Sequence, residues 1–275
     1  MRPLSEFAPA ARAGIRGVFL DIDDTLTTRG RLTAVAYLAL EKLKRQGLLV
    51  IPVTGRPAGW CDHIARMWPV DGVVGENGAF YFTYDTVQNK LLKRFVSQEN
   101  AGGKERAARK GRLAEIAAHI LHEVPGTALA SDQGYREAGI AIDFCEDVPP
   151  LPRAAIERIA TLMREAGLTA KISSIHVNGW FGDYDKLSTT RLFMHERFGI
   201  DLDSAKDAFV FVGDSPNDAP MFGYFPYAVG VANVRDFIGT MPALPAFVTG
   251  KDCGEGFAEV VKILTEARSG RQNIG

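Results

Sequence analysis

The chain has 275 residues, a formal net charge of −1 and 46% hydrophobic residues, a composition typical of a globular protein with one large core or two smaller ones. Because the charge is almost balanced, it argues against a nucleic acid or a membrane surface as partner and favours a small molecule. The three cysteines form no CxxC pair, so we expect reduced thiols and neither a disulfide framework nor a zinc site.

The first residues, MRPLSEFAPAARAGIR, lack the apolar central stretch of a signal peptide. No run of about 18 apolar residues occurs in the sequence. We therefore expect a cytoplasmic protein, whose oligomeric state no pattern indicates.

The first third of the chain alternates expected strands and helices in the order of βαβ units. Residues 17–21 (GVFLD) and 48–55 (LLVIPVTG) are apolar on both faces, as the strands of a buried parallel sheet are. Residues 32–47 carry helical periodicity, and we expect a second helix to begin at Pro57. Residues 71–82 (DGVVGENGAFYF) predict a strand, a turn and another strand.

The pattern changes in the middle of the chain. Residues 98–124 predict a charged loop that leads into a helix, and residues 152–167 predict a second helix. Residues 139–144 (GIAIDF) and 170–181 (AKISSIHVNGWF) alternate as strands with one polar face do. Such strands beside paired helices indicate an α+β unit with an antiparallel sheet.

The βαβ order returns near the end of the chain, with expected strands in residues 207–218, 226–233 and 245–250 and a helix in residues 256–268. We therefore expect an α/β fold with an insertion. A Rossmann-like parallel-sheet core would comprise residues 1–83 and 182–275, and an inserted α+β cap would comprise residues 84–181.

Two carboxylates, Asp21 and Asp23, follow the first expected strand. They can point to the same side if the extended geometry persists, because side chains alternate along a strand. Ligands of open parallel sheets bind beyond the carboxyl ends of the strands, which is where this pair would lie. Two adjacent carboxylates either share a proton, which raises one pKa, or stay ionised beside a cation such as Mg²⁺.

A second acidic pair, Asp214 and Asp218, follows the expected strand near the end of the chain. If Ser215 caps a helix that Pro216 begins, Asp218 can face back toward Asp214. Acidic residues at a helix start also favour the helix dipole without any ligand. The coincidence of two strand-end acidic pairs in one chain favours a shared site.

Thr54, Gly55 and Arg56 end the second expected strand. A hydroxyl, exposed backbone amides and a cation at this place suit a phosphate. The alternative is an ordinary turn into the helix that begins at Pro57. Lys186, which opens an expected helix, is ambiguous in the same way, because most such lysines are merely solvated.

Taken in chain order, these segments resemble the motifs of the haloacid dehalogenase superfamily of phosphotransferases. DIDDT at 21–25 is similar to the DxDxT motif, VTGR at 53–56 to the Ser/Thr motif, Lys186 to the motif lysine, and GDSPND at 213–218 to the acidic motif. The resemblance covers the whole chain, because one branch carries a large α/β cap between the second and third motifs. NGA at 77–79 also resembles that branch, which includes sucrose-phosphate and mannosyl-phosphoglycerate phosphatases and phosphomannomutases.

The resemblance implies catalytic roles for four residues. Asp21 would be the nucleophile that forms an aspartyl-phosphate, and Asp23 would protonate the leaving oxygen and later deprotonate the attacking water. Thr54 and Lys186 would hold the phosphoryl oxygens.

The resemblance also implies a Mg²⁺ site. Its ligands would be Asp21, the backbone carbonyl of Asp23, and Asp214, with Asp218 in support. Asp24 stands where many relatives have glycine, and we expect it to face away from the metal.

We expect substrate choice to lie mainly in the cap. The candidate substrate-binding residues are Thr54, Gly55, Arg56, Asn77 and Lys186 in the core and Arg136, His176 and Asn178 in the cap. The alternative for His176 is an ordinary strand histidine, and we expect Trp180, Phe181 and Tyr184 to pack the hinge between cap and core.

These expectations together predict a Mg²⁺-dependent phosphomonoester hydrolase that acts on a small phosphorylated metabolite, a sugar phosphate. A sugar phosphomutase would use the same aspartyl-phosphate. A signalling module that accepts a phosphoryl group would be much shorter and would have no use for a cap. A catalytically silent metabolite-binding protein is disfavoured by the intact motifs.

Overall fold

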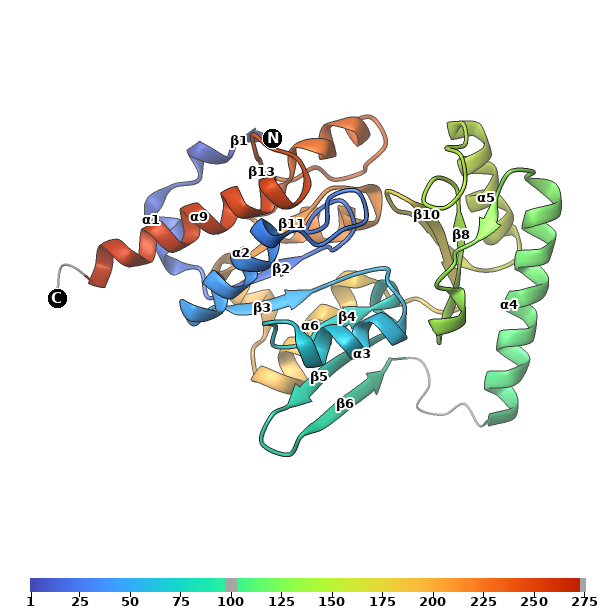
Figure 1. The fold of residues 1–275 in the computed structure, drawn as a ribbon, viewed down its shortest axis with the longest axis horizontal. Helices are drawn as coiled ribbons and strands as arrows, with labels where there is room; N and C mark the ends of the chain where they lie inside the picture. Colours follow the sequence, from blue (N-terminus) through green and yellow to red (C-terminus); the bar gives the residue numbers. More distant parts are fainter. Residues whose placement is uncertain (97–102, 273–275) are drawn as a thin grey trace.

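The computed structural model describes residues 1–96 and 103–272, and Figure 1 shows their arrangement. A six-stranded sheet, in which all neighbouring strands are parallel, forms the centre of the larger body. In spatial order its strands are β1 (Arg2–Pro3), β13 (Phe247–Val248), β12 (Val229–Gly230), β11 (Phe209–Gly213), β2 (Gly17–Leu20) and β3 (Leu49–Pro52).

Helices cover both faces of this sheet, which explains why its strands are apolar on both sides. On one face, Val18 and Leu20 of β2 join an apolar cluster to which α2 (Ala34–Arg45) and α9 (Cys253–Gln272) contribute. On the other face, Phe19 packs in a cluster with residues of α6 (Lys186–Phe198) and α8 (Ala219–Tyr224). This part of the chain also contains α1 (Pro9–Gly14), α3 (Ala58–Met67) and α7 (Leu202–Ala205).

A small antiparallel sheet extends the core beside α3. It consists of β4 (Val73–Gly75), β5 (Phe80–Asp85) and β6 (Lys90–Phe95). Strand β6 pairs with β5 along its whole length, so the chain returns to the core after the turn. The expected boundary between residues 83 and 84 therefore falls inside this hairpin.

A four-stranded antiparallel sheet forms a separate layer. Its order is β7 (Ala128–Leu129), β8 (Gly139–Asp143), β10 (His176–Trp180) and β9 (Thr169–Ile172). Helices α4 (Gly103–Glu123) and α5 (Arg153–Glu165) pack on it, and Figure 1 shows this layer at one end of the larger body. The α/β fold class predicted from the sequence is confirmed. Pro57, expected as the first residue of α3, is its cap residue.

The alternation of side chains along β10 determines which of them face the larger body. Val177 lies in the apolar cluster with α4 and α5, and a Cβ on Gly179 would lie 2.8 Å from the sulfur of Met163 in α5. His176, Asn178 and Trp180 must therefore point to the opposite face. That face carries the polar groups that meet the core. No helix among the described residues has both the length and the apolar character needed to cross a membrane.

Candidate active site

The acidic residues predicted from the strand ends meet in space. Strands β2 and β11 are neighbours in register, with Phe19 beside Phe211, so their carboxyl ends lie side by side. Asp21, Asp214 and Asp218 each offer a carboxylate oxygen, and these oxygens lie within 4.8 Å of one another. All three side chains are buried.

The turn after β11 brings Asp218 back toward Asp214, as its spacing predicts. Asp218 Oδ2 accepts hydrogen bonds from the backbone N–H groups of Asp214 at 3.0 Å and Ser215 at 3.3 Å. Ser215 caps the short 3₁₀ turn Pro216–Asp218 that leads into α8. Gly213 permits this approach, because a Cβ there would lie 2.5 Å from Asp218 Oδ2.

Lys186 inserts its side chain into the acidic residues. Its Nζ lies 2.7 Å from Asp218 Oδ1 and 3.0 Å from Asp21 Oδ1. The Lys186 side chain is 1% exposed, so the alternative of a solvated lysine is wrong. Asp185 caps α6 through a reciprocal hydrogen-bond pair with Ser188 and so fixes Lys186 at the first position of the helix.

The charges of this cluster do not balance. Burial raises the pKa of Asp21, Lys186 lowers it and Asp218 raises it, and the result is about 8. Burial, together with Asp218 and Asp21, raises the pKa of Asp214 well above its ordinary value. Burial lowers the pKa of Lys186, but Asp21 and Asp218 raise it more, so the lysine stays charged. Three carboxylates therefore share one ammonium group.

The cluster fits a divalent cation bound by oxygen. Asp21 Oδ1 is buried and, apart from the Lys186 ammonium, has no polar partner among the described residues. Asp214 is held in place by hydrogen bonds from the Thr25 hydroxyl at 3.0 Å and the Asn233 amide at 3.2 Å. An all-oxygen, negatively charged donor set in which Asp21 Oδ1 lacks a hydrogen bond suits a hard ion such as Mg²⁺.

Asp23 and Asp24 face other partners. Asp23 Oδ1 accepts a hydrogen bond from the Arg56 guanidinium at 2.8 Å. Asp24 has a φ of 52°, a conformation that glycine adopts more easily, and its carbonyl accepts from Asn233 at 3.0 Å. Burial raises the pKa of Asp24. Asp24 lines a cavity together with Ser174, so it faces the four-stranded layer.

Thr54 and several side-chain amides lie in the region that follows β3. Thr54 is fully buried, and its hydroxyl accepts from the backbone N–H of Arg56 at 3.0 Å. A Cβ on Gly55 would lie 3.2 Å from Asn77 Nδ2 and 3.7 Å from Asn178 Nδ2. Asn217 donates to Asn77 Oδ1 at 3.3 Å, so the NGA segment contacts residues of the last motif.

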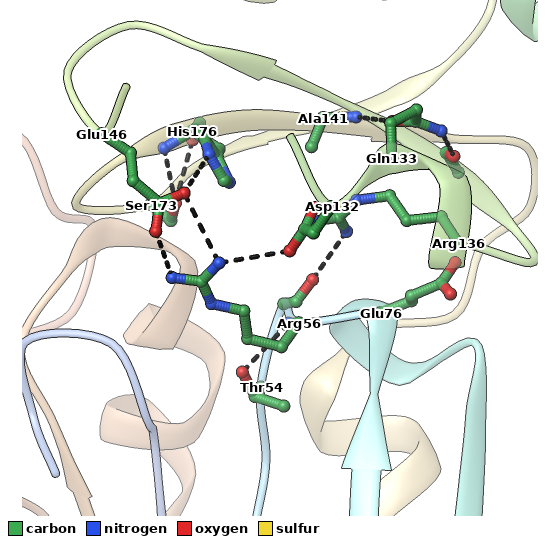
Figure 2. Close-up of polar contacts among 12 residues, drawn as sticks. Thr54, Arg56, Glu76, Asp132, Gln133, Arg136, Ala141, Glu146, Ser173 and His176 are labelled. Atoms are coloured by element: carbon green, nitrogen blue, oxygen red, sulfur yellow. Dashed lines mark hydrogen bonds and ion pairs between the residues drawn. The ribbon is translucent and has the colours of Figure 1, made fainter. Parts of the chain in front are cut away.

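The Arg56 side chain reaches toward the four-stranded layer, as Figure 2 shows. In addition to Asp23, its guanidinium donates to Asp132 at 3.2 Å and to Glu146 at 2.6 Å. The guanidinium carbon lies 4.4 Å from the centre of the Trp60 ring. Burial lowers the pKa of Arg56, but Asp23 and Glu146 raise it more.

The three predicted cap residues also lie at this interface. Arg136 donates to the Gly55 carbonyl at 2.8 Å and to Asp132 at 3.1 Å. His176 Nε2 lies 2.9 Å from Glu146 Oε2. Asn178 Oδ1 is buried and has no hydrogen-bond partner among the described residues. Trp180 and Tyr184 stack and pack with core residues, as expected, whereas Phe181 packs against the apolar cluster of α4 and α5.

The structure adds three acidic residues that the sequence did not single out. Glu76 accepts backbone hydrogen bonds from Ala58 at 3.1 Å, Glu137 at 2.8 Å and Ala138 at 2.7 Å, so it ties the core to the four-stranded layer. Asp132 and Glu146 bind Arg56 from loops of that layer. The position of Glu76 next to the NGA segment could have indicated a role for it. Asp132 and Glu146 lie in loops where no sequence pattern indicates one.

The chain is similar in sequence to known hydrolases. Residues 18–102 match the family described as haloacid dehalogenase-like hydrolase. A phosphoglycolate phosphatase of Archaeoglobus fulgidus is 28% identical over 251 residues, which are 90% of this chain and 96% of that protein.

Two solved structures share the fold over nearly the whole chain. The C-terminal domain of the trehalose-6-phosphate phosphatase of C. albicans aligns with a TM-score of 0.70 and 12% identity, covering 96% of this chain and 98% of that one. The sucrose-phosphatase of Synechocystis aligns with a TM-score of 0.59 and 14% identity, covering 91% and 98%. The predicted resemblance is confirmed.

Proposed function

We propose that this chain, a phosphatase similar to those of the haloacid dehalogenase type, hydrolyses a sugar phosphate with Mg²⁺ as cofactor. The observation that carries the proposal is the buried cluster of Asp21, Asp214 and Asp218 around Lys186. This cluster places a carboxylate that can act as nucleophile beside other carboxylates at the carboxyl ends of two parallel strands.

Asp21 would attack the phosphorus of the ester. The bond between phosphorus and the leaving oxygen breaks as an aspartyl-phosphate forms, and Asp23 gives its proton to that oxygen. Asp23 then takes a proton from a water molecule, whose oxygen attacks the phosphorus and releases phosphate from Asp21. Arg56 fixes the carboxylate of Asp23 in place through their contact at 2.8 Å.

Thr54 and Lys186 would bind the phosphoryl oxygens. Lys186 is fully buried in a dry environment, where its charge acts on developing negative charge with little screening. Asp21, Asp214 and the backbone carbonyl of Asp23 would hold the Mg²⁺, with Asp218 in support. When bound, this ion supplies positive charge that offsets the crowded carboxylates and the phosphoryl group.

We also propose that residues 84–181 contain the cap that selects the substrate. The hydrogen bonds of Arg56 and Arg136 run between the core and the four-stranded layer, so this layer covers the strand ends. Separation of the two parts would admit the ester, and their closure would exclude water.

A panel of phosphate esters incubated with Mg²⁺ tests the proposal by release of free phosphate. We expect turnover of at least one sugar phosphate, its loss on addition of a chelator and its recovery with Mg²⁺. The panel includes phosphoglycolate, because the curated relative carries that name. Formation of a sugar-phosphate isomer without phosphate release would identify a phosphomutase, and turnover unaffected by chelation would contradict the metal role.

A further inference from the structure

A cavity of about 390 Å³ lies between the core and the four-stranded layer, beside the proposed proton donor. The core contributes Asp23, Asp24 and Arg56 to its wall, and the other layer contributes Glu146 and Ser174. If the proposed function holds, the alcohol that receives its proton from Asp23 must occupy the space next to Asp23. The cavity is therefore the place of the leaving group.

The charges around this cavity are unfavourable for a second anionic group on the substrate. Asp23, Asp24 and Glu146 contribute carboxylates. Arg56 is the buried cation of the wall, and its guanidinium already donates to Asp23, Asp132 and Glu146. Arg29 also lines the cavity but is exposed to solvent, which screens its charge.

Glu146 is held in this position from two sides. Arg56 contacts Glu146 Oε1 at 2.6 Å, and His176, on β10, contacts Oε2 at 2.9 Å. Figure 2 shows Glu146 between these two partners. Burial alone would raise the pKa of Glu146, but its contacts with His176 and Arg56 lower it to about 2. The group is thus a fixed anion at neutral pH, with 23% of its side chain exposed.

We propose that Glu146 is a specificity-determining residue that disfavours phosphate esters carrying a carboxylate and favours uncharged polyhydroxy leaving groups. A substrate carboxylate would meet the like charges of Glu146 and Asp24, and it could bind Arg56 only by displacing one of three carboxylates. Hydroxyl groups would instead donate hydrogen bonds to the same carboxylates. The proposal rests on the proposed function and adds the chemistry of the leaving group.

The experiment uses two esters of almost the same size, 2-hydroxyethyl phosphate and phosphoglycolate, which differ in a hydroxymethyl group and a carboxylate. The kcat/KM ratio of the two esters is measured with Mg²⁺ for the wild type, Glu146→Gln, Glu146→Asp and the control Glu157→Gln. Glu157 is exposed on α5 and pairs with Arg153. Binding of both esters is measured separately with Asp21→Asn, with and without Glu146→Gln.

We expect the wild type to favour the neutral ester about tenfold or more in kcat/KM. Glu146→Gln should bring this ratio close to one, whereas Glu146→Asp, which keeps the charge, and Glu157→Gln should preserve it. The affinities measured with Asp21→Asn should also favour the neutral ester, and adding Glu146→Gln should remove this preference. A merely structural role of Glu146 would weaken both esters equally and leave the ratio unchanged.

The outcomes separate this proposal from the proposed function. Turnover of both esters with a ratio that Glu146→Gln does not alter, or a wild-type preference for phosphoglycolate, would overturn the proposal and leave the phosphatase standing. Preferential binding of the neutral ester, lost with Glu146→Gln, in a protein that releases phosphate from neither of these esters nor from any sugar phosphate of the panel would support the proposal and contradict the proposed function. Absence of binding to both esters would overturn the proposal.

Discussion

Two groups of charged residues lie within the same interface but differ in how their charge is balanced. The acidic cluster consists of Asp21, Asp214, Asp218 and Lys186. The arginine network consists of Arg56, Asp23, Asp132, Glu146, His176 and Arg136. In the acidic cluster the pKa values of Asp21 and Asp214 are raised, whereas in the arginine network that of Glu146 is lowered.

The difference follows from the partners of the carboxylates. In the acidic cluster, burial destabilises the charged carboxylates by more than the attraction of a single lysine offsets, so an additional cation would stabilise the cluster. In the arginine network a forked guanidinium reaches three carboxylates at once. Arg136 binds the other oxygen of Asp132, and His176 lies 2.9 Å from the other oxygen of Glu146. The acidic cluster thus has a place for a further cation, whereas the arginine network links two parts of the chain.

The nucleophile gives the comparison its strongest test. Asp21→Asn should lower kcat by roughly 10³-fold or more, because an amide cannot form the aspartyl-phosphate. It also removes one of the like charges of the acidic cluster, so the fold should persist, as circular dichroism and thermal unfolding would show. Asp236→Asn, at an exposed position, is the matched control. Activity of Asp21→Asn near that of the control would contradict the assignment.

Lys186 tests whether the acidic cluster lacks positive charge. Lys186→Met should lower the free energy of unfolding by about 4 kcal/mol without Mg²⁺, because it leaves buried carboxylates uncompensated. The loss should be smaller in saturating Mg²⁺, since the ion would replace part of the missing charge. Urea unfolding with and without Mg²⁺ measures both values. The same loss under both conditions would mean that no Mg²⁺ binds beside these carboxylates.

Glu76 is a third kind of buried carboxylate, compensated by backbone N–H groups of both parts of the chain. Glu76→Ala leaves three donors without their acceptor and should lower the free energy of unfolding by about 3 kcal/mol. Glu165→Ala, at an exposed position of α5, is the control in the same urea experiment. A loss no larger than that of the control would show that water replaces the carboxylate and that Glu76 does not fasten the joint.

The two groups also differ in what the sequence could predict. Asp21, Asp214, Asp218 and Lys186 each follow or open a recognisable element, and the parallel sheet brings the strand ends together, so local patterns located most of this cluster. Alternation along β10 likewise places His176 and Asn178 on one face.

The partners of Arg56 could not be predicted in this way. Asp132 and Glu146 are 76 and 90 residues away from it, in loops without periodicity, and only the docking of two layers brings them together. Arg56 itself was expected at a phosphate because its motif suggested an anion. The anions that it binds in the structure are side chains of the same chain. The sequence patterns also did not indicate that β6 returns to the core, because this return depends on the turn that pairs β6 with β5.

The smallest expected effect concerns Glu146, through the pH dependence of stability. The pKa of Glu146 is lowered from its ordinary 4.5 to about 2 in the folded chain. Its contribution is therefore present above pH 4.5 and is lost as the pH falls toward 2. Because the carboxylate is partly exposed and screened, we expect Glu146→Gln to lower the free energy of unfolding by about 2 kcal/mol at pH 7 and by roughly half of that at pH 3. Urea unfolding of wild type and variant at both pH values measures the difference. If the loss of unfolding free energy is the same at both pH values, Glu146 acts through shape and neutral hydrogen bonds. Charge would then contribute less to the stability of the arginine network than to that of the acidic cluster.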